Sequence, residues 1–291
     1  MSVHTIAVLG AGIMGRGIAH VAALGGFTTL LQDTNREALQ NAANEVSATL
    51  EKGVATGKVS DQDALDARKR LRTVHSLDEA AAKADLVIEA VPEKIDLKVE
   101  IFARLDKVAP EHAILASNTS SLSITEMAAA TRRAPQVVGL HFFNPVHRMR
   151  LLEIVRALET SERTLETCLD VGRKMGKESV VVRESPGFVT SRINAMIGNE
   201  AFYMLQEGVA SAADIDRALK LGLNHPMGPF ELVDLVGLDT RLSILRFLHR
   251  TLGEKFRPCP LLEQYVAGGR LGRKSGRGVY DYAPAEGTVA S

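Results

Sequence analysis

The chain has 291 residues, 45% of them hydrophobic, a length that suits one core of ordinary size plus a smaller one. Lysine plus arginine and aspartate plus glutamate both total 35, so no net charge draws nucleic acid or an anionic membrane to the whole surface. Cys168 and Cys259 lie far apart, without a CxxC motif or a His/Cys cluster. This pattern argues against a disulfide framework or a metal site, and it favours reduced thiols and a cytoplasmic location.

The N-terminus passes from His4 directly into an apolar run, with no basic segment or small-residue cleavage site. We therefore expect no secretory signal. Apolar runs elsewhere are broken by Gly, Asp or Glu well before the roughly 20 residues needed to cross a bilayer, which predicts no membrane span.

The first 185 residues alternate strand-like and helical segments. The β-rich runs 5–9 and 27–31 enclose a Gly-rich turn and a helical stretch, which together form one βαβ unit. Later apolar runs suit a parallel sheet that is covered on both faces, and the last two of them flank a helix near 161–175 and extend the sheet at one edge. These runs are 85–91, 113–116, 136–140, 151–155 and 179–182. The order predicts an α/β fold of the Rossmann type.

Residues 36–71 are expected to form a charged helix pair, split by Gly53 and Gly57, that projects from the sheet as an insertion. After 186–187 strands disappear and amphipathic helices follow. We place the domain boundary there and predict domains at 1–185 and 186–291, the second one all-α. Its helices are expected at 188–206, 211–221, 229–251 and 260–267, and the tail after Tyr282 is expected to fray. The Leu-rich faces of so small a domain predict a homodimer through the C-terminal helices.

The turn at 10–15, Gly-Ala-Gly-Ile-Met-Gly, matches GxGxxG in the strand-to-helix context that gives this pattern its meaning. Gly10 permits the tight turn, Gly12 lets the backbone approach a pyrophosphate, and Gly15 lets the helix pack on the strand. Asp33 follows Gly15 by 18 positions, as expected of a carboxylate that binds the adenosine ribose and favours NAD over NADP. Arg36 nearby leaves strictness for NAD open, and a helix N-cap is the alternative role for Asp33.

His141 ends an apolar run, and Glu153 interrupts another one twelve positions later. A neutral imidazole suits the base that removes a hydroxyl proton while hydride leaves the carbon. A single histidine at a strand end is more often a core residue. However, a buried carboxylate is costly unless it is paired. If the two strands are neighbours, Glu153 can accept a hydrogen bond from His141, fix its tautomer and stabilise the imidazolium.

The chain resembles the L-3-hydroxyacyl-CoA dehydrogenases, including the bacterial 3-hydroxybutyryl-CoA dehydrogenases, over essentially its whole length. The motifs that carry the resemblance are 10–15, 117–121 (Ser-Asn-Thr-Ser-Ser), 141–145 (His-Phe-Phe-Asn-Pro), 152–153, 186–188 (Pro-Gly-Phe), 224–229 (Asn-His-Pro-Met-Gly-Pro) and 271–276 (Leu-Gly-Arg-Lys-Ser-Gly).

The resemblance implies an NAD-dependent, reversible oxidation of an L-3-hydroxyacyl-CoA, with His141 as general base, Glu153 as its partner and Ser120 bound to the substrate oxygen. In the helix pair, Thr49, Lys52 and Lys58 are candidates for the coenzyme A nucleotide, with a solvated face as the alternative for the lysines. Positions that the resemblance places at the cofactor are Gly10, Gly12, Ile13, Met14, Gly15, Asp33, Ala90, Glu93, Lys98, Asn118, Asn144 and Lys274.

One position departs from the family pattern. Where the family commonly has an asparagine at the substrate oxygen site, this chain has Ser191, and Asn194 lies one helical turn further on. Either side chain can complete the site. The acyl chain length and the pathway, whether fatty acid metabolism, butyrate metabolism or aromatic catabolism, stay open at this point.

Two other functions fit parts of the sequence. A dehydrogenase of free 3-hydroxy acids, similar to gulonate 3-dehydrogenase and its crystallin relative, would keep the fold and the His141–Glu153 pair, and Ser191 permits it. A non-catalytic NAD-binding protein would keep only the fold, and the carboxylate of Glu153 in an apolar strand argues against it.

Overall fold

The structure is a computed structural model that describes residues 2–282. The chain divides into two compact units, 1–185 and 186–291. The tail after Tyr282, which the sequence predicts to be frayed, lies outside the described residues. Within those residues, no helix combines the length and the apolar character that a membrane crossing requires.

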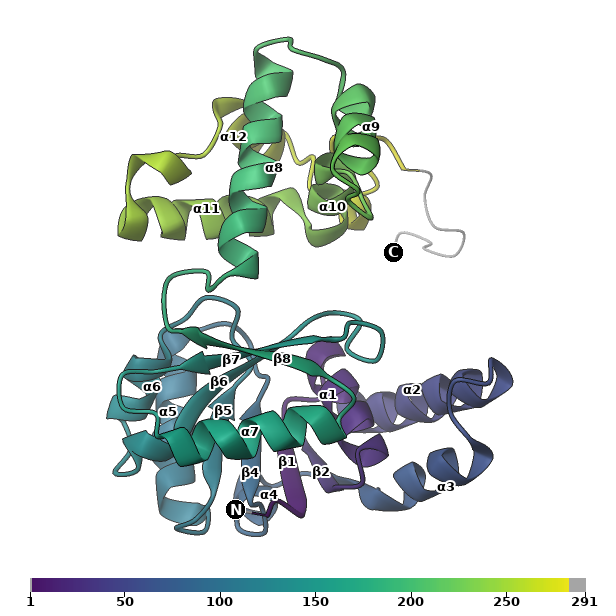
Figure 1. The fold of residues 1–291 in the computed structure, drawn as a ribbon, viewed down its shortest axis with the longest axis vertical. Helices are drawn as coiled ribbons and strands as arrows, with labels where there is room; N and C mark the ends of the chain where they lie inside the picture. The colour runs from purple at the N-terminus through teal and green to yellow at the C-terminus, as the bar shows by residue number, and fades with distance from the viewer. Residues whose placement is uncertain (1, 283–291) are drawn as a thin grey trace. The chain divides into compact units, whose positions relative to one another are not determined.

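The N-terminal unit is built on one eight-stranded sheet, in the order β3-β2-β1-β4-β5-β6-β7-β8 (Figure 1). All neighbouring strands run parallel except β6 and β7, which are antiparallel. The predicted Rossmann-type α/β fold is confirmed. The strands are β1 (Thr5–Leu9), β2 (Thr28–Gln32), β3 (Leu71–Val74), β4 (Leu86–Glu89), β5 (Ile114–Ser117), β6 (Val137–Phe142), β7 (Leu151–Arg156) and β8 (Glu178–Arg183).

Helices cover both faces of this sheet. On one face, apolar side chains of α1 and α7 share a core with the strands, and α7 crosses in front of the sheet in Figure 1. On the other face, α4, α5 and α6 pack side by side. The helices are α1 (Ile13–Leu24), α2 (Arg36–Ala55), α3 (Asp61–Arg70), α4 (Leu77–Ala81), α5 (Ile95–Val108), α6 (Ile124–Ala129) and α7 (Glu162–Lys174), with a short 3₁₀ turn η1 (Ala134–Gln136).

Strand alternation sends the polar side chains of three strands to one face. In β6, Leu140 and Phe142 belong to the core shared with α1 and α7, so His141 points to the α4–α6 face. The same alternation places Glu89 of β4 and Ser117 of β5 on that face, near the carboxyl ends of their strands. Ligands of open α/β sheets bind at this edge.

Two details of the N-terminal unit differ from the sequence prediction. Residues 36–71 are not wholly an insertion, because α3 leads directly into β3, an edge strand that the sequence reading missed. The helix pair also does not split at Gly53, which lies inside α2. The turn comes at Gly57, whose φ of 67° is in the left-handed region that favours glycine.

Up to Tyr282, where the described residues end, the C-terminal unit consists of helices and isolated bridges. The predicted helix at 229–251 is wrong in one respect, since it is two helices that meet at Gly237, where φ is 104°. A chain at that φ cannot continue an α-helix. The elements are α8 (Thr190–Gln206), α9 (Ala212–Gly222), α10 (Pro229–Val236), α11 (Leu238–Leu252), η2 (Glu254–Phe256), α12 (Pro260–Ala267) and η3 (Arg273–Ser275).

Acid sensitivity is expected from His20 on α1, which is buried and stacks on His147 with ring centroids 5.8 Å apart. Desolvation, with smaller contributions from His147 and Lys177, lowers the pKa of His20 from 6.5 to about 4. As the pH falls, His20 is therefore protonated in the unfolded chain before it is protonated in the folded protein. The contribution of neutral His20 to the unfolding free energy is complete above pH 6.5 and is lost as the pH falls towards 4.

We expect His20→Gln to remove this sensitivity. Relative to the variant, the native protein should lose up to about 3 kcal/mol of unfolding free energy between neutral pH and pH 4. Urea unfolding followed by circular dichroism at several pH values measures the difference. The exposed His4, changed to Gln, is the control, and a pH-independent difference for His20→Gln would contradict the expectation.

Candidate active site

The glycine turn after β1 has the stereochemistry that the sequence predicts. Gly10 has φ 97°, and its amide donates to the carbonyl of Gln32 at 2.8 Å. A Cβ on Gly15 would lie 1.7 Å from the carbonyl oxygen of Gly10, so only glycine lets α1 start this close to the turn. Gly12 differs, because a Cβ there would meet nothing within 4 Å. The space over Gly12 is therefore left open by the protein itself.

A cavity of about 790 Å³ lies beside this turn. Asp33 borders it, and its carboxylate accepts from the backbone amides of Ala11 and Asn35, both at 2.8 Å. The N-cap of α2 is Asn35 rather than Asp33, so the alternative role for Asp33 does not apply. The cavity size and the glycine cradle fit the adenosine half of a dinucleotide. Predicted cofactor residues that line the cavity are Gly10, Gly12, Ile13, Met14, Asp33 and Ala90.

Gly12→Ala tests whether a ligand needs the open space. The added methyl group meets no protein atom, so we expect stability to stay the same or rise slightly. NADH affinity should fall at least about tenfold, since the methyl group lies where the pyrophosphate must approach the backbone. Fluorescence titration with NADH measures it. Gly222→Ala, which also meets nothing within 4 Å, should change neither property, and unchanged NADH affinity in Gly12→Ala would contradict the predicted path of the cofactor.

His141 and Glu153 face each other across the antiparallel pair β6–β7, where they are register partners. The Nδ1 atom of His141 lies 2.7 Å from Oε2 of Glu153. Glu153 is completely buried and His141 is 7% exposed. With the carboxylate ionised, Nδ1 carries the proton and donates it to Glu153, which leaves Nε2 as the basic nitrogen. The structure thus contains the contact that makes this histidine suitable as a proton acceptor.

The polar loop after β5 is tied to the strand that carries His141. The side-chain oxygen of Asn118 accepts from the amide of Phe142 at 2.9 Å, and the amide of Asn118 donates to the carbonyl of Glu89 at 2.8 Å. Ser120 follows two residues later and is half-buried. Its amide donates to Oε1 of Glu93 at 3.0 Å. The loop is therefore held in place by contacts with both neighbouring strands and with the turn after β4.

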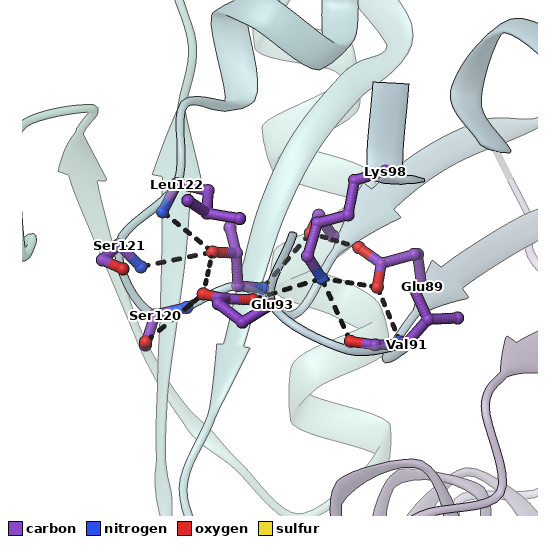
Figure 2. A network of polar contacts seen from close by, with 9 residues as sticks. Glu89, Val91, Glu93, Lys98, Ser120, Ser121 and Leu122 are labelled. Atoms are coloured by element: carbon purple, nitrogen blue, oxygen red, sulfur yellow. Dashed lines mark hydrogen bonds and ion pairs between the residues drawn. The ribbon is translucent and has the colours of Figure 1, made fainter. Parts of the chain in front are cut away.

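Glu89 is a residue of this site that the sequence reading missed. It is completely buried, accepts from the hydroxyl of Ser117 and receives Lys98, each at 2.6 Å. A signal for it exists in the sequence, because Glu89 interrupts the apolar run 85–91 just as Glu153 interrupts 151–155. Figure 2 shows the polar contacts around this carboxylate.

Two of the predicted cofactor residues, Glu93 and Lys98, lie together at this place. Lys98 is 1% exposed, and its ammonium is surrounded by Glu89, the carbonyl of Val91 and Glu93. Glu93 is more open, with 40% of its side chain exposed. Lys98 would thus affect a cofactor either by positioning Glu93 or by the electrostatic effect of its own charge. A third residue, Asn144, is exposed and borders a separate cavity of about 140 Å³.

That smaller cavity also adjoins the helix pair. Thr49 of α2 lines it together with Arg16, Asn144 and His147. Lys52 and Lys58 are exposed, and their positive charges contribute to lowering the pKa of His147, after desolvation, Arg148 and Lys177. Several positive charges therefore gather around one small opening, although the lysines are also solvated. Both roles predicted for these lysines fit this position.

The remaining predicted residues lie in the C-terminal unit. Ser191 and Asn194 are half-buried, three residues apart on α8, and therefore on one face of that helix. Lys274 lies in η3, and its ammonium contacts the carboxylate of Asp239 at 2.6 Å.

Comparison with known proteins identifies the family. Residues 5–185 match the model of the 3-hydroxyacyl-CoA dehydrogenase NAD binding domain, and residues 187–282 match the model of the C-terminal domain of the same family. The chain is 48% identical over 283 residues to a probable 3-hydroxybutyryl-CoA dehydrogenase of Bacillus subtilis, covering 97% of this chain and 98% of that protein.

Two further relatives agree. The mitochondrial hydroxyacyl-coenzyme A dehydrogenase of Homo sapiens is 41% identical, covering 96% of this chain and 91% of that protein. The crystal structure of (S)-3-hydroxybutyryl-CoA dehydrogenase from Ralstonia eutropha superposes with a TM-score of 0.93 at 43% identity, covering 97% of this chain and all of that one. The chain therefore belongs to the 3-hydroxyacyl-CoA dehydrogenase family, and its N-terminal domain is an NAD-binding domain.

Proposed function

We propose that this protein catalyses the reversible, NAD-dependent oxidation of an L-3-hydroxyacyl-CoA to the 3-ketoacyl-CoA, with His141 as general base. The observation that carries the proposal is the 2.7 Å contact between His141 and the buried Glu153, in a domain of the NAD-binding type. NAD supplies the hydride acceptor. The protein has to bind the thioester, orient its 3-hydroxyl group and take up one proton.

Nε2 of His141 accepts the proton of the substrate hydroxyl as the C–O bond becomes a carbonyl. Glu153 keeps the ring in the tautomer that exposes this nitrogen, and its charge stabilises the imidazolium that forms. The hydroxyl of Ser120 donates a hydrogen bond to the same substrate oxygen. In the reverse direction the imidazolium returns the proton to the oxygen.

The proposal also gives roles to residues of the C-terminal unit. Ser191 or Asn194 binds the substrate oxygen, and Lys274 binds the cofactor. Thr49, Lys52 and Lys58 bind the anionic nucleotide of coenzyme A, which the positive charges around the 140 Å³ cavity support.

We also propose a homodimer formed through the helical unit and a cytoplasmic location. Large apolar side chains of that unit stay exposed, among them Leu221 at 80% and Leu223 at 66%. Such side chains are typical of surfaces that pair with a second subunit. Both cysteines are buried free thiols, as suits a reducing compartment.

The purified protein with NADH and acetoacetyl-CoA tests the proposal. The absorbance of NADH should fall with time, and a series of 3-ketoacyl-CoA substrates of increasing length should give the preferred acyl group from kcat/KM. Absence of turnover with both short and medium 3-ketoacyl-CoA would contradict the proposal. Turnover of free 3-hydroxy acids without coenzyme A would instead support the alternative function, a dehydrogenase of free 3-hydroxy acids.

A further inference from the structure

Glu89 lies at the centre of a closed ring of side chains at the carboxyl ends of β4 and β5. We call it the Glu89 ring, and its members are Glu89, Glu93, Lys98, Ser117 and Thr119. One arm runs through Ser117, whose hydroxyl donates to Oε2 of Glu89 at 2.6 Å and accepts from the amide of Thr119 at 3.2 Å. This arm fixes the backbone one residue before Ser120.

The second arm runs through Lys98. Its ammonium donates to Oε1 of Glu89 at 2.6 Å and lies 3.3 Å from Oε2 of Glu93. The other oxygen of Glu93 accepts from the hydroxyl of Thr119, from the amide of Ser120 at 3.0 Å and, more weakly, from the hydroxyl of Ser120 at 3.5 Å. Figure 2 shows Glu93 between Lys98 and Ser120. Both arms therefore start at Glu89 and end at the turn that carries Ser120.

The burial of the ring members indicates that the position of Glu93 depends on the charges of Glu89 and Lys98. Glu89 and Lys98 are 0% and 1% exposed, whereas 40% of the side chain of Glu93 is exposed. Two carboxylates share the buried ammonium of Lys98. Because Glu89 already neutralises its charge, Lys98 can contact Glu93 at 3.3 Å while the side chain of Glu93 stays partly exposed. If Glu89 were neutral, Glu93 would be the remaining counter-ion, and we expect it to move towards Lys98 and away from Ser120.

The turn that the ring holds also touches the strand of the proposed base. Thr119 accepts from the amides of Ser121 and Leu122, and Asn118 accepts from the amide of Phe142, next to His141. We propose that Glu89 is a positioning residue that acts on the reaction through Ser120, by fixing Glu93, Thr119 and thereby the direction of the Ser120 hydroxyl. The inference rests on the proposed function, in which this hydroxyl binds the substrate oxygen.

The test is a double-mutant cycle between Glu89→Gln and Ser120→Ala. With acetoacetyl-CoA and saturating NADH, Glu89→Gln should lower kcat about tenfold, because the donor is misplaced. In the Ser120→Ala background, Glu89→Gln should lower kcat less than about twofold, since the hydroxyl that it positions is already absent. A merely structural role would give losses that multiply.

Asp106→Asn is the matched control. Asp106 is also a buried carboxylate, and it lies at the other end of α5 from Lys98, where it binds Arg132 and Arg133 at 2.9 and 3.0 Å. Its substitution should leave kcat unchanged and should combine additively with Ser120→Ala, even if it lowers the melting temperature.

Hydrogen exchange of the peptide covering 118–122 supplies a readout that does not depend on activity. Several amides of this peptide donate hydrogen bonds to members of the Glu89 ring. Glu89→Gln should therefore speed their exchange about tenfold, while Asp106→Asn should not. If Glu89→Gln fails to fold, the double substitution Glu89→Leu/Lys98→Met replaces the buried ion pair by apolar side chains of similar volume and should remain folded. It should also lower kcat and speed exchange at 118–122, because Ser117 loses its acceptor Glu89 and Glu93 loses the ammonium of Lys98.

The possible failures can be told apart. An inactive native protein would contradict the proposed function, and the exchange experiment alone would then decide whether the ring holds the turn. Three results would each overturn the inference about Glu89. They are an unchanged kcat in Glu89→Gln, losses of kcat that multiply when Glu89→Gln is combined with Ser120→Ala, and unchanged hydrogen exchange at 118–122.

Discussion

Replacement of His141 by asparagine is expected to lower kcat by about 10³-fold, while NADH affinity stays within about twofold of the native value. If His141 is the base, as we propose, then without the imidazole no group at this position accepts the hydroxyl proton as hydride leaves. Asparagine is the informative choice because its side-chain nitrogen can still donate to Glu153, so that the completely buried carboxylate keeps a partner. Steady-state kinetics with acetoacetyl-CoA and fluorescence titration with NADH measure the two quantities.

His112 offers a matched control for this substitution. Its Nε2 atom lies 2.9 Å from a carboxylate oxygen of Asp85, but His112 is exposed and comes before the start of β5, whereas His141 lies near the end of β6. His112→Asn should leave kcat unchanged. If His141→Asn loses NADH binding and turnover in equal measure, then His141 is a structural residue rather than the base.

The second large effect is expected for Glu153→Gln, which should lower kcat about 10²-fold with little change in NADH affinity. The amide is nearly isosteric, but it carries no charge to stabilise the imidazolium. It can also turn its NH₂ group towards Nδ1 and favour the wrong tautomer of His141. The same kinetic and binding measurements apply.

The two substitutions should not be additive. In the proposed mechanism Glu153 acts only through His141, so Glu153→Gln in the His141→Asn background should cost little further activity. An unchanged kcat in Glu153→Gln alone would show that the carboxylate serves only to hold β6 against β7. Losses that multiply would show that Glu153 contributes to catalysis independently of the histidine.

The cofactor turn was predictable because its chemistry is local. Gly10 and Gly15 are required by a positive φ and by a close approach within six residues, so the spacing in the sequence carries the information. The His141–Glu153 pair was predictable for a different reason. A carboxylate in an apolar strand requires a partner, and the antiparallel register of β6 and β7 provides one.

Other features depend on contacts that a one-dimensional pattern does not contain. β3 has only four residues, two of them exposed and polar, and it follows α3 without a break, so its partner β2 is what makes it a strand. Glu89 carries the same signal as Glu153, but it stands at the end of its strand beside a turn, where a carboxylate is usually solvated. Its burial comes from Lys98 of α5, which packs over it.

The break between α10 and α11 has a related cause. Both helices are amphipathic, and a single residue, Gly237, separates them, so the periodic pattern runs on through the break. The choice between Ser191 and Asn194 is likewise not fixed by sequence, because both lie on one face of α8.

The proposed reaction is tested most directly by comparing acetoacetyl-CoA with free acetoacetate, each with NADH, for the native protein and for His141→Asn. We expect the native protein to oxidise NADH with acetoacetyl-CoA at a kcat/KM at least about a hundredfold above that for acetoacetate, and His141→Asn to lose this activity while still binding NADH. Equal or faster turnover of acetoacetate, or an active His141→Asn protein, would contradict the proposal.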